Sequence, residues 1–207
     1  MKKTYFLLFS LLTFSSYMSG MDCLGECAGE IKEFISGDNF REVSPNRCYR
    51  SKQMSPSHLN TYLRKHKIGY IVNLCSKEEN EQDWYKLEKR VAQLNKAQVI
   101  DVPLHRKDMP TKESLLKLLE VLNAHKDDVI LIHCLWGIDR TGLVAFLWKF
   151  LIEGKSKKEA AKELTDWVLY PWWNHWEWNR PNMDKFIRLT PNDASDFQRW
   201  LNEDYSY

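Results

Sequence analysis

Residues 133–142 read HCLWGIDRTG, and this stretch decides the fold. The apolar run VILIH at residues 129–133 predicts a buried strand. Recurring apolar residues after the stretch predict a helix that starts near Arg140 and ends at Gly154. The sequence therefore places a cysteine and an arginine, six residues apart, on a turn that leads from a strand into the N-terminus of a helix.

Such a turn is suited to binding an oxyanion. Successive backbone N–H groups can curl around one anion, the helix N-terminus adds partial positive charge, and an arginine fork can bind two phosphate oxygens at once. The same groups stabilise a thiolate, so we expect the pKa of Cys134 to lie well below the ~8.5 of a free cysteine and its sulfur to be a nucleophile. The predicted phosphate cradle consists of Leu135, Trp136, Gly137, Ile138, Asp139 and Arg140.

Strand and helix patterns alternate along the rest of the chain. Short β-rich runs cover residues 68–75 and 98–104, and helical periodicity begins at Pro56 and recurs over 83–94. Thr111 is a predicted N-cap for the helix that follows Pro110, and Ser156 opens a capping box with Glu159. This alternation predicts an α/β fold, a single domain with a largely parallel central sheet flanked by helices.

The N-terminus has the layout of a secretory signal peptide. Lys2 and Lys3 precede the apolar run YFLLFSLLTF at residues 5–14, and small or polar residues follow to Gly20. We therefore expect a signal peptide over residues 1–20, an N-terminal extension over 21–44 and the folded domain over 45–207. The protein is predicted to be exported, either to the periplasm or as a secreted protein.

Charge gives no indication of a polyanionic partner. Without Lys2 and Lys3, 28 cationic side chains balance 28 anionic ones, so we expect no nucleic-acid binding. The leader is too short to span a bilayer unaided, and no later segment is long and apolar enough, so no stable membrane span is expected once the leader is removed. The sequence does not predict the oligomeric state.

His133, Cys134, Arg140 and Thr141 match the complete signature of one enzyme superfamily. The chain resembles the protein tyrosine phosphatases, whose signature is His-Cys, five residues, Arg, then Ser or Thr. It also looks similar upstream to the small bacterial dual-specificity-like cysteine phosphatases, since NFREVSPNRCYRSKQMSP, IGYIVNLC and DVPLHRKDMPT precede the signature in the expected order. The resemblance covers about residues 40–151.

The resemblance implies a mechanism without metal or cofactor. Cys134 attacks phosphorus and forms a phosphocysteine, while Arg140 and the loop amides hold the equatorial oxygens. Thr141 donates a hydrogen bond to the departing sulfur when water hydrolyses the intermediate. His133 orients the loop and helps to hold the thiolate, although a core histidine that merely ends the strand is an alternative for the same residue.

The resemblance also implies a general acid, an aspartate on a loop N-terminal to the signature. Asp108 fits best, because it lies between a predicted strand and a capped helix. Asp139 within the cradle and Asp101 within the predicted strand are the alternatives.

Several substrates remain open. The expected one is a phosphorylated protein, as for tyrosine or dual-specificity phosphatases. The ending Asp139-Arg140-Thr141 is shared with lipid-directed relatives, which leaves inositol phosphates and phosphoinositides as an alternative. Extra phosphates would then meet His105, Arg106 and Lys107, which could equally form a solvated loop.

Two other classes of protein compete with a phosphatase. One is a catalytically silent phosphate-binding module that uses the same cradle, which the intact Cys134, Arg140 and Thr141 disfavour. The other is a sulfurtransferase or arsenate reductase, which the spacing and Arg140-Thr141 disfavour.

Two compositional features have open interpretations. The tryptophan-rich stretch from Trp167 to Trp178 predicts a packed cover for the core, or a substrate wall or partner surface. In an exported protein the four cysteines other than Cys134 can form at most two disulfides in three pairings, although Cys75 could simply be buried at the end of a strand. These four are Cys23, Cys27, Cys48 and Cys75.

Overall fold

A computed structural model describes residues 37–105, 107–164 and 180–207 of the 207-residue chain. The expected signal peptide, Cys23 and Cys27, Arg106 and the stretch from Trp167 to Trp178 lie outside the described residues. The five-stranded sheet and the predicted phosphate cradle lie within the three described ranges.

Five strands form one central sheet in the order β1-β2-β5-β3-β4. Strands β2, β5, β3 and β4 run parallel, and only β1 pairs with β2 in an antiparallel hairpin. The largely parallel sheet predicted from the sequence is confirmed, and its three predicted strands are present. The strands are β1 Arg41–Ser44, β2 Cys48–Lys52, β3 Tyr70–Asn73, β4 Gln98–Asp101 and β5 Ile130–Cys134.

The helices begin where the sequence provides caps. Ser55 accepts a hydrogen bond from the backbone N–H of His58, and Thr111 accepts one from that of Ser114, so each satisfies a donor of the first helical turn. The long helices of the first half are α3 Pro56–His66, α5 Asp83–Leu94 and α6 Lys112–Ala124. The others are α4 Lys77–Asn80, α7 Asp139–Leu147, α8 Lys157–Ala160, α9 Arg180–Leu189 and α10 Phe197–Glu203.

The predicted helix after the signature has two parts. Helix α7 continues into a π-helical segment, Trp148–Ile152, and the chain then turns at Gly154 with φ of +64°. A positive φ suits glycine, so the predicted end of the helix is correct.

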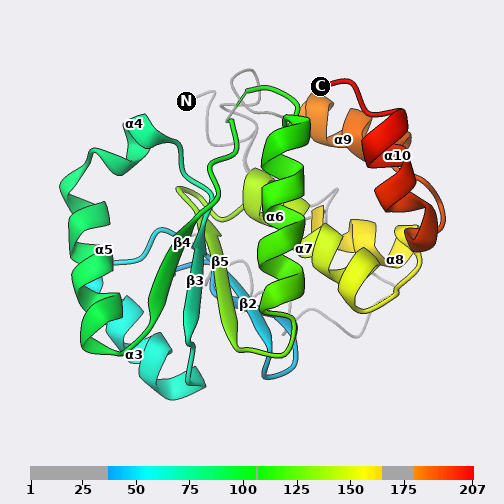
Figure 1. Ribbon diagram of the computed structural model, residues 1–207. Helices are drawn as coiled ribbons and strands as arrows, with labels where there is room; N and C mark the ends of the chain where they lie inside the picture. The colour runs from blue at the N-terminus through cyan, green and yellow to red at the C-terminus, as the bar shows by residue number, and fades with distance from the viewer. Residues whose placement is uncertain (1–36, 106, 165–179) are drawn as a thin grey trace, which may run out of the picture. The chain divides into compact units, whose positions relative to one another are not determined.

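Helices cover both faces of the sheet (Figure 1). Helices α3, α4 and α5 lie on one side, and α6 to α10 lie on the other. Neighbouring residues of each strand point to opposite faces, so Ile71 and Leu131 pack in one core while Val72 and Ile132 pack in the second, larger one. The sheet is therefore buried on both sides, as expected for parallel strands.

The hairpin corrects the predicted domain boundary. Residues 21–44 were expected to be an extension, but Arg41–Ser44 forms β1 and pairs with β2, and Asp38 already belongs to the compact unit that continues to Tyr207. The folded domain therefore begins at Asp38 and not at residue 45.

The described cysteines correct part of the disulfide expectation. Cys48 and Cys75 are free thiols, and both are fully buried in the larger core. Burial raises the pKa of both thiols, which keeps them protonated and unreactive. For Cys75, burial at the end of a core strand is the correct interpretation.

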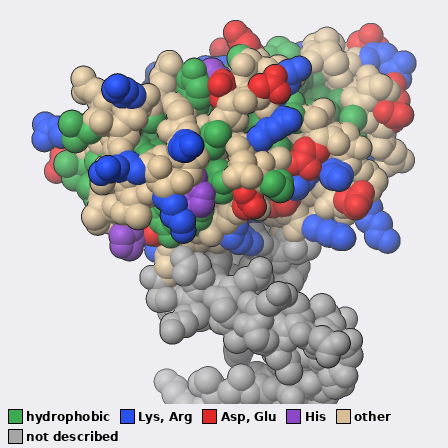
Figure 2. Space-filling model, turned by 90° about the horizontal axis from the view of Figure 1, so that it is seen from below, with side chains coloured by type: hydrophobic (Ala, Val, Ile, Leu, Met, Phe, Trp, Pro, Cys, Tyr) green, Lys and Arg blue, Asp and Glu red, His purple; other side chains and the backbone are tan. Residues whose placement is uncertain are grey.

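The surface carries charges of both signs. Lys and Arg side chains are interspersed with Asp and Glu over the face that Figure 2 shows, in keeping with a formal net charge of +2. Within residues 37–105, 107–164 and 180–207, no helix has the length and apolarity needed to cross a membrane.

Candidate functional site

The predicted cradle is a tight loop between β5 and α7. Cys134 is the last residue of β5, Asp139 is the first of α7, and the backbone N–H of Gly137 donates to the Cys134 sulfur at 3.2 Å. Gly137 has φ of +69°, and a Cβ there would lie 2.4 Å from the backbone carbonyl of Ser51 on β2. Only glycine fits, because the loop is pressed against the neighbouring strand.

Two side chains hold the loop carbonyls from behind. Arg50 Nη2 donates to the carbonyls of Gly137 at 3.1 Å and Ile138 at 3.3 Å, and Asn39 Nδ2 donates to those of Gly137 at 3.0 Å and Trp136 at 3.3 Å. Within one planar trans peptide group the C=O and N–H point in opposite directions. Because the carbonyls of residues 136–138 are bonded to Arg50 and Asn39, the N–H groups that follow them point the opposite way, toward the thiol.

The thiol of Cys134 is buried but acidic. Burial works against ionisation, yet the positive charge of Arg140 and hydrogen bonds from Thr141 and Trp136 lower the pKa of Cys134 below its ordinary value. Thr141 is itself fully buried. The expected lowering of the pKa of Cys134 is thus present in this fold.

Arg140 is held in place by a carboxylate that the sequence analysis missed. Its Nη1 and Nη2 donate to the two carboxylate oxygens of Glu79 at 2.6 and 2.9 Å, and Nη1 also donates to the carbonyl of Leu74 at 3.2 Å. Glu79 in turn accepts from the backbone N–H of Ser76 at 2.7 Å, completing the capping box of α4. The Ser-x-x-Glu pattern predicts the capping box, but it does not predict the contact of Glu79 with Arg140.

The contact with Glu79 leaves one edge of the guanidinium for an anion. Burial opposes the charge of Arg140, but the hydrogen bonds to Glu79 raise the pKa of Arg140 further, so it stays cationic. Glu79 takes the Nη1–Nη2 end, whereas the Nε–Nη2 edge retains two N–H donors that can bind phosphate side-on.

The comparison with known families agrees with this geometry. The model of a family described as a DSP-PTPase phosphatase fused to NAD+ kinase matches residues 31–168, which is more than half the chain. The chain belongs to this family. The matched residues include the phosphatase loop, defined here as residues 134–140. They also include Arg50 and Asn39, which bond its carbonyls, and Glu79.

Individual relatives match the chain over a smaller part of its length or at low sequence identity. The dual specificity protein phosphatase TpbA of Pseudomonas aeruginosa is 30% identical over 66 residues, which are 32% of this chain and 30% of the relative. The crystal structure of P. aeruginosa TpbA has a TM-score of 0.58 at 18% identity, covering 80% of this chain and 92% of that one. TpbA carrying a cysteine-to-serine substitution was also solved in complex with pTyr.

A second solved phosphatase has the same fold. The core catalytic domain of the PP-IP phosphatase SIW14 from S. cerevisiae has a TM-score of 0.54 at 22% identity, covering 80% of this chain and 92% of that one. At these identities the solved structures show that the fold is shared.

His133 of the phosphatase signature is paired with a buried acid. Its Nε2 lies 3.2 Å from Oε2 of Glu88, and both side chains are 2% exposed. The same Glu88 oxygen accepts from Gln53 Nε2 at 2.9 Å. Burial disfavours the imidazolium, but Glu88 and the sulfur of Cys134 outweigh it and raise the pKa of His133.

Sequence reasoning missed Glu88 because the apolar spacing of α5 does not show which face is buried. Leu87 and Leu94 recur at helical spacing but are 41% and 78% exposed, while Glu88 and Ala92 are buried. The helix is turned so that a carboxylate reaches the strand carrying His133. No pattern within α5 alone could have indicated this.

The three candidate acids have different surroundings. Asp108 lies on the loop after β4 with its side chain 71% exposed, 2.6 Å from Nδ1 of His105. Asp139 is half-buried at the start of α7. Both carboxylate oxygens of Asp101 serve the fold, since Oδ1 accepts from Asn73 at 3.0 Å and Oδ2 accepts from the hydroxyl of Tyr85.

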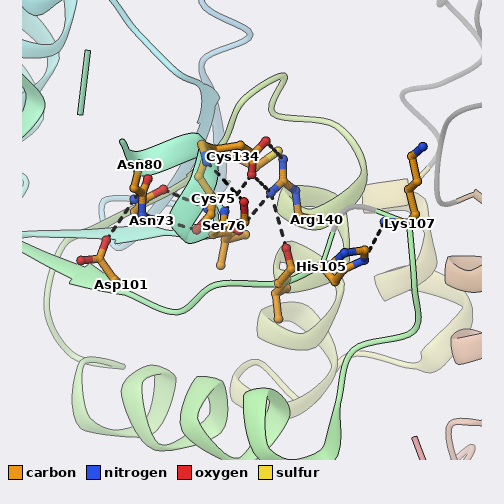
Figure 3. Close-up of polar contacts among 12 residues, drawn as sticks. Asn73, Cys75, Ser76, Asn80, Asp101, His105, Lys107, Cys134 and Arg140 are labelled. Atoms are coloured by element: carbon orange, nitrogen blue, oxygen red, sulfur yellow. Dashed lines mark hydrogen bonds and ion pairs between the residues drawn. The ribbon is translucent and has the colours of Figure 1, made fainter. Parts of the chain in front are cut away.

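The basic segment beside the loop is partly described. His105 and Lys107 are exposed on the segment that leads from β4 past Arg140 (Figure 3). Within the phosphatase loop the apolar side chains differ, since Trp136 is 46% exposed and Ile138 is buried. No group of three or more His, Cys, Asp or Glu side chains that could hold a metal ion occurs among residues 37–105, 107–164 and 180–207.

Proposed function

We propose that the protein is a phosphomonoester hydrolase that works through a phosphocysteine. The observation that carries this proposal is an acidic, buried thiol at the centre of a loop whose N–H groups and arginine face the same point. Cys134 attacks phosphorus, and the bond to the leaving oxygen breaks as Asp108 donates a proton to that oxygen. Water then hydrolyses the phosphocysteine, which releases phosphate and restores the thiol.

The other loop residues stabilise charge in this scheme. Arg140 binds two equatorial phosphate oxygens through its Nε–Nη2 edge, and the backbone N–H groups of residues 135–140 bind the rest. The Thr141 hydroxyl donates a hydrogen bond to the Cys134 sulfur as that sulfur leaves phosphorus in the second step. His133, held by Glu88, places positive charge beside β5 and favours the thiolate.

For the substrate we favour a phosphotyrosyl protein. Leu135, Trp136 and Ile138 bring no cation into the loop, and the exposed ring of Trp136 is suited to contact an aromatic phosphoester. TpbA, with which the chain shares its fold, was solved with pTyr. One observation favours inositol phosphates instead: His105 and Lys107 are exposed beside the loop, and SIW14 is a PP-IP phosphatase.

Phosphate release tests both the reaction and the substrate. The mature, reduced protein is given a phosphotyrosyl peptide and, separately, an inositol polyphosphate, with Cys134→Ser as the blank. We expect faster release from the peptide and none from the Cys134→Ser variant. Faster release from the inositol polyphosphate would change the substrate class, while tight binding without turnover by the unmodified protein would indicate a silent phosphate-binding module.

We further propose that the protein is exported and acts in the periplasm or outside the cell. The support is the leader pattern of residues 1–20. Replacing Leu8 in its apolar run by Arg is expected to leave the protein in the cytoplasm with its leader attached, as fractionation and N-terminal sequencing would detect. Unchanged export of the Leu8→Arg variant would contradict the proposal.

A further inference from the structure

The C-terminal part of the chain is bonded to the segment that carries Asp108. Asn182 of α9 donates from Nδ2 to the carbonyl of Lys107 at 2.7 Å, and the hydroxyl of Tyr205 donates to the carbonyl of Pro110. Asp108 lies between these two carbonyls. The acid loop, defined here as residues 107–110, is therefore bonded to the C-terminal segment on both sides of its carboxylate.

Further bonds continue the attachment into the next helix. The backbone N–H of Lys112 donates to the carbonyl of Tyr207 at 2.7 Å, and its Nζ donates to the carbonyl of Asn202 at 2.6 Å. In Figure 1 the end of the chain and α9 lie beside the N-terminal end of α6. The attachment thus extends from the acid loop to the first residue of α6.

The C-terminal segment is itself firmly packed. Phe186 and Leu201 are fully buried, and Phe186 meets the rings of Trp200 and Tyr205 edge to face, with centroids 5.9 Å apart in both pairs. Met183, one residue after Asn182, is also buried. Donors on such a segment have fixed positions, so they can position what they bind.

Within the acid loop Met109 and Pro110 are buried, but Lys107 and Asp108 are exposed. The Asp108 side chain is 71% exposed, and its partner His105 is 61% exposed. An exposed pair of this kind contributes little to stability. Glu78 of α4 also faces His105 and Lys107 is adjacent, so several charges surround the carboxylate without packing around it.

We propose that Asn182 and Tyr205 are positioning residues for the general acid, holding the backbone on both sides of Asp108 so that its carboxyl reaches the leaving oxygen. This rests on the proposed function, with Asp108 as the acid. Neither residue touches substrate. Both lie beyond residue 168, where the family match ends.

A positioning role predicts an effect that depends on the leaving group. Tyrosine is a poor leaving group because its phenol has a pKa of about 10, so it needs the proton from the acid. A nitro-substituted phenol is far more acidic and departs almost without help. Misplacing Asp108 therefore slows hydrolysis of phosphotyrosine and spares that of p-nitrophenyl phosphate.

The test uses the double variant Asn182→Ala with Tyr205→Phe in the full mature chain. We expect kcat/KM for a phosphotyrosyl peptide to fall about 10-fold and that for p-nitrophenyl phosphate to fall less than about 3-fold. In an Asp108→Asn background the double variant should add no further loss. Tyr205→Phe alone keeps the buried ring and removes only the hydroxyl, so it serves if the double variant does not fold.

The control is Asn95→Ala. Asn95 follows α5, on the other side of the sheet from α9. Its Nδ2 donates to Oδ1 of Asn60 and to the carbonyl of Val91, both at 2.9 Å, so the variant loses comparable bonds far from the acid loop. It should alter neither substrate's rate.

Three results separate the outcomes. Equal losses on both substrates, or a further loss in the Asp108→Asn background, would show that the C-terminal residues only support the fold. Full activity of Asp108→Asn beside an inactive Cys134→Ser would remove the acid, and this inference with it, while leaving the phosphatase intact. Failure of the unmodified protein to release phosphate would contradict the proposed function itself.

Discussion

The two halves of the candidate site are built in opposite ways. The phosphatase loop is buried at Gly137, Ile138 and Arg140, its carbonyls are bonded to Arg50 and Asn39, and its central glycine touches the neighbouring strand. The acid loop holds its aspartate in solvent, with backbone bonds on either side. The contrast indicates that anion binding depends on preorganised dipoles, whereas proton donation depends on a group that can approach the substrate.

The glycine at the back of the phosphatase loop should be the most sensitive position. Gly137→Ala places a Cβ 2.4 Å from a backbone carbonyl and forces alanine to a φ of +69°. We expect a loss of about 3 kcal/mol or more in unfolding free energy, since strain and overpacking add. Urea unfolding measures this, and Gly69→Ala, with no atom within 4 Å of its Cβ, is the control. Wild-type stability of Gly137→Ala would show that the loop is not pressed against β2.

Substitution of Arg50 should have the next largest effect on stability. Its Nη1 donates to the backbone carbonyl of Glu163 at 2.7 Å while Nη2 holds the loop, and one lysine nitrogen cannot make both sets of bonds. We expect Arg50→Lys to cost about 1 to 3 kcal/mol and to weaken competitive inhibition by inorganic phosphate about 10-fold. A structural role alone would lower stability and leave phosphate inhibition unchanged.

A surface arginine gives the matched comparison for Arg50. Arg47 is 48% exposed and lies 3.7 Å from Asp127. Arg47→Lys should change stability by less than about 0.5 kcal/mol and leave phosphate inhibition unaltered.

The buried pair of His133 and Glu88 predicts a dependence of stability on pH. The folded protein holds the His133 proton more tightly than the unfolded chain does, so the stabilisation is complete below about pH 6.5 and is lost as the pH rises through the folded-state pKa. Glu88→Gln should remove this loss and lower stability at acidic pH by about 1 to 3 kcal/mol.

The titration of the Cys134 thiol must be eliminated before this pH dependence is measured. A thiol with a lowered pKa in the folded state adds stability as the pH rises, which opposes the trend from His133. Both unfolding series are therefore compared in a Cys134→Ser background. Parallel pH profiles with and without Glu88→Gln would mean that the pair does not set the protonation of His133.

The groups that face the thiol could be predicted from sequence, because they all lie within residues 133–142. The cysteine, the arginine and the strand–turn–helix order lie within a single stretch, and the acidity of Cys134 follows from them. The groups behind it could not be predicted. Other elements supply Arg50, Glu79 and Glu88. Charged residues usually lie on the surface, and only the order of the strands in the sheet shows that these three lie beside the loop.

The hairpin was missed for the same reason. Strand β2 contains Arg50 and Ser51, both buried, so its letters do not show the apolar pattern of a central strand. Of these two, Arg50 bonds the phosphatase loop. A functional requirement therefore removed the pattern that would have revealed the strand.

The smallest effect on stability should come from Asp108, the proposed acid. Asp108→Asn changes an exposed side chain, so unfolding free energy should stay within about 0.5 kcal/mol of the wild type. Phosphate release from a phosphotyrosyl peptide should nevertheless fall by roughly 10² to 10⁴-fold, the usual effect of losing a positioned acid. The same loss in Asp139→Asn alone would move the acid into the phosphatase loop. Stability lost together with activity in Asp108→Asn would erase the contrast, because the acid loop would then be as tightly built as the loop that binds phosphate.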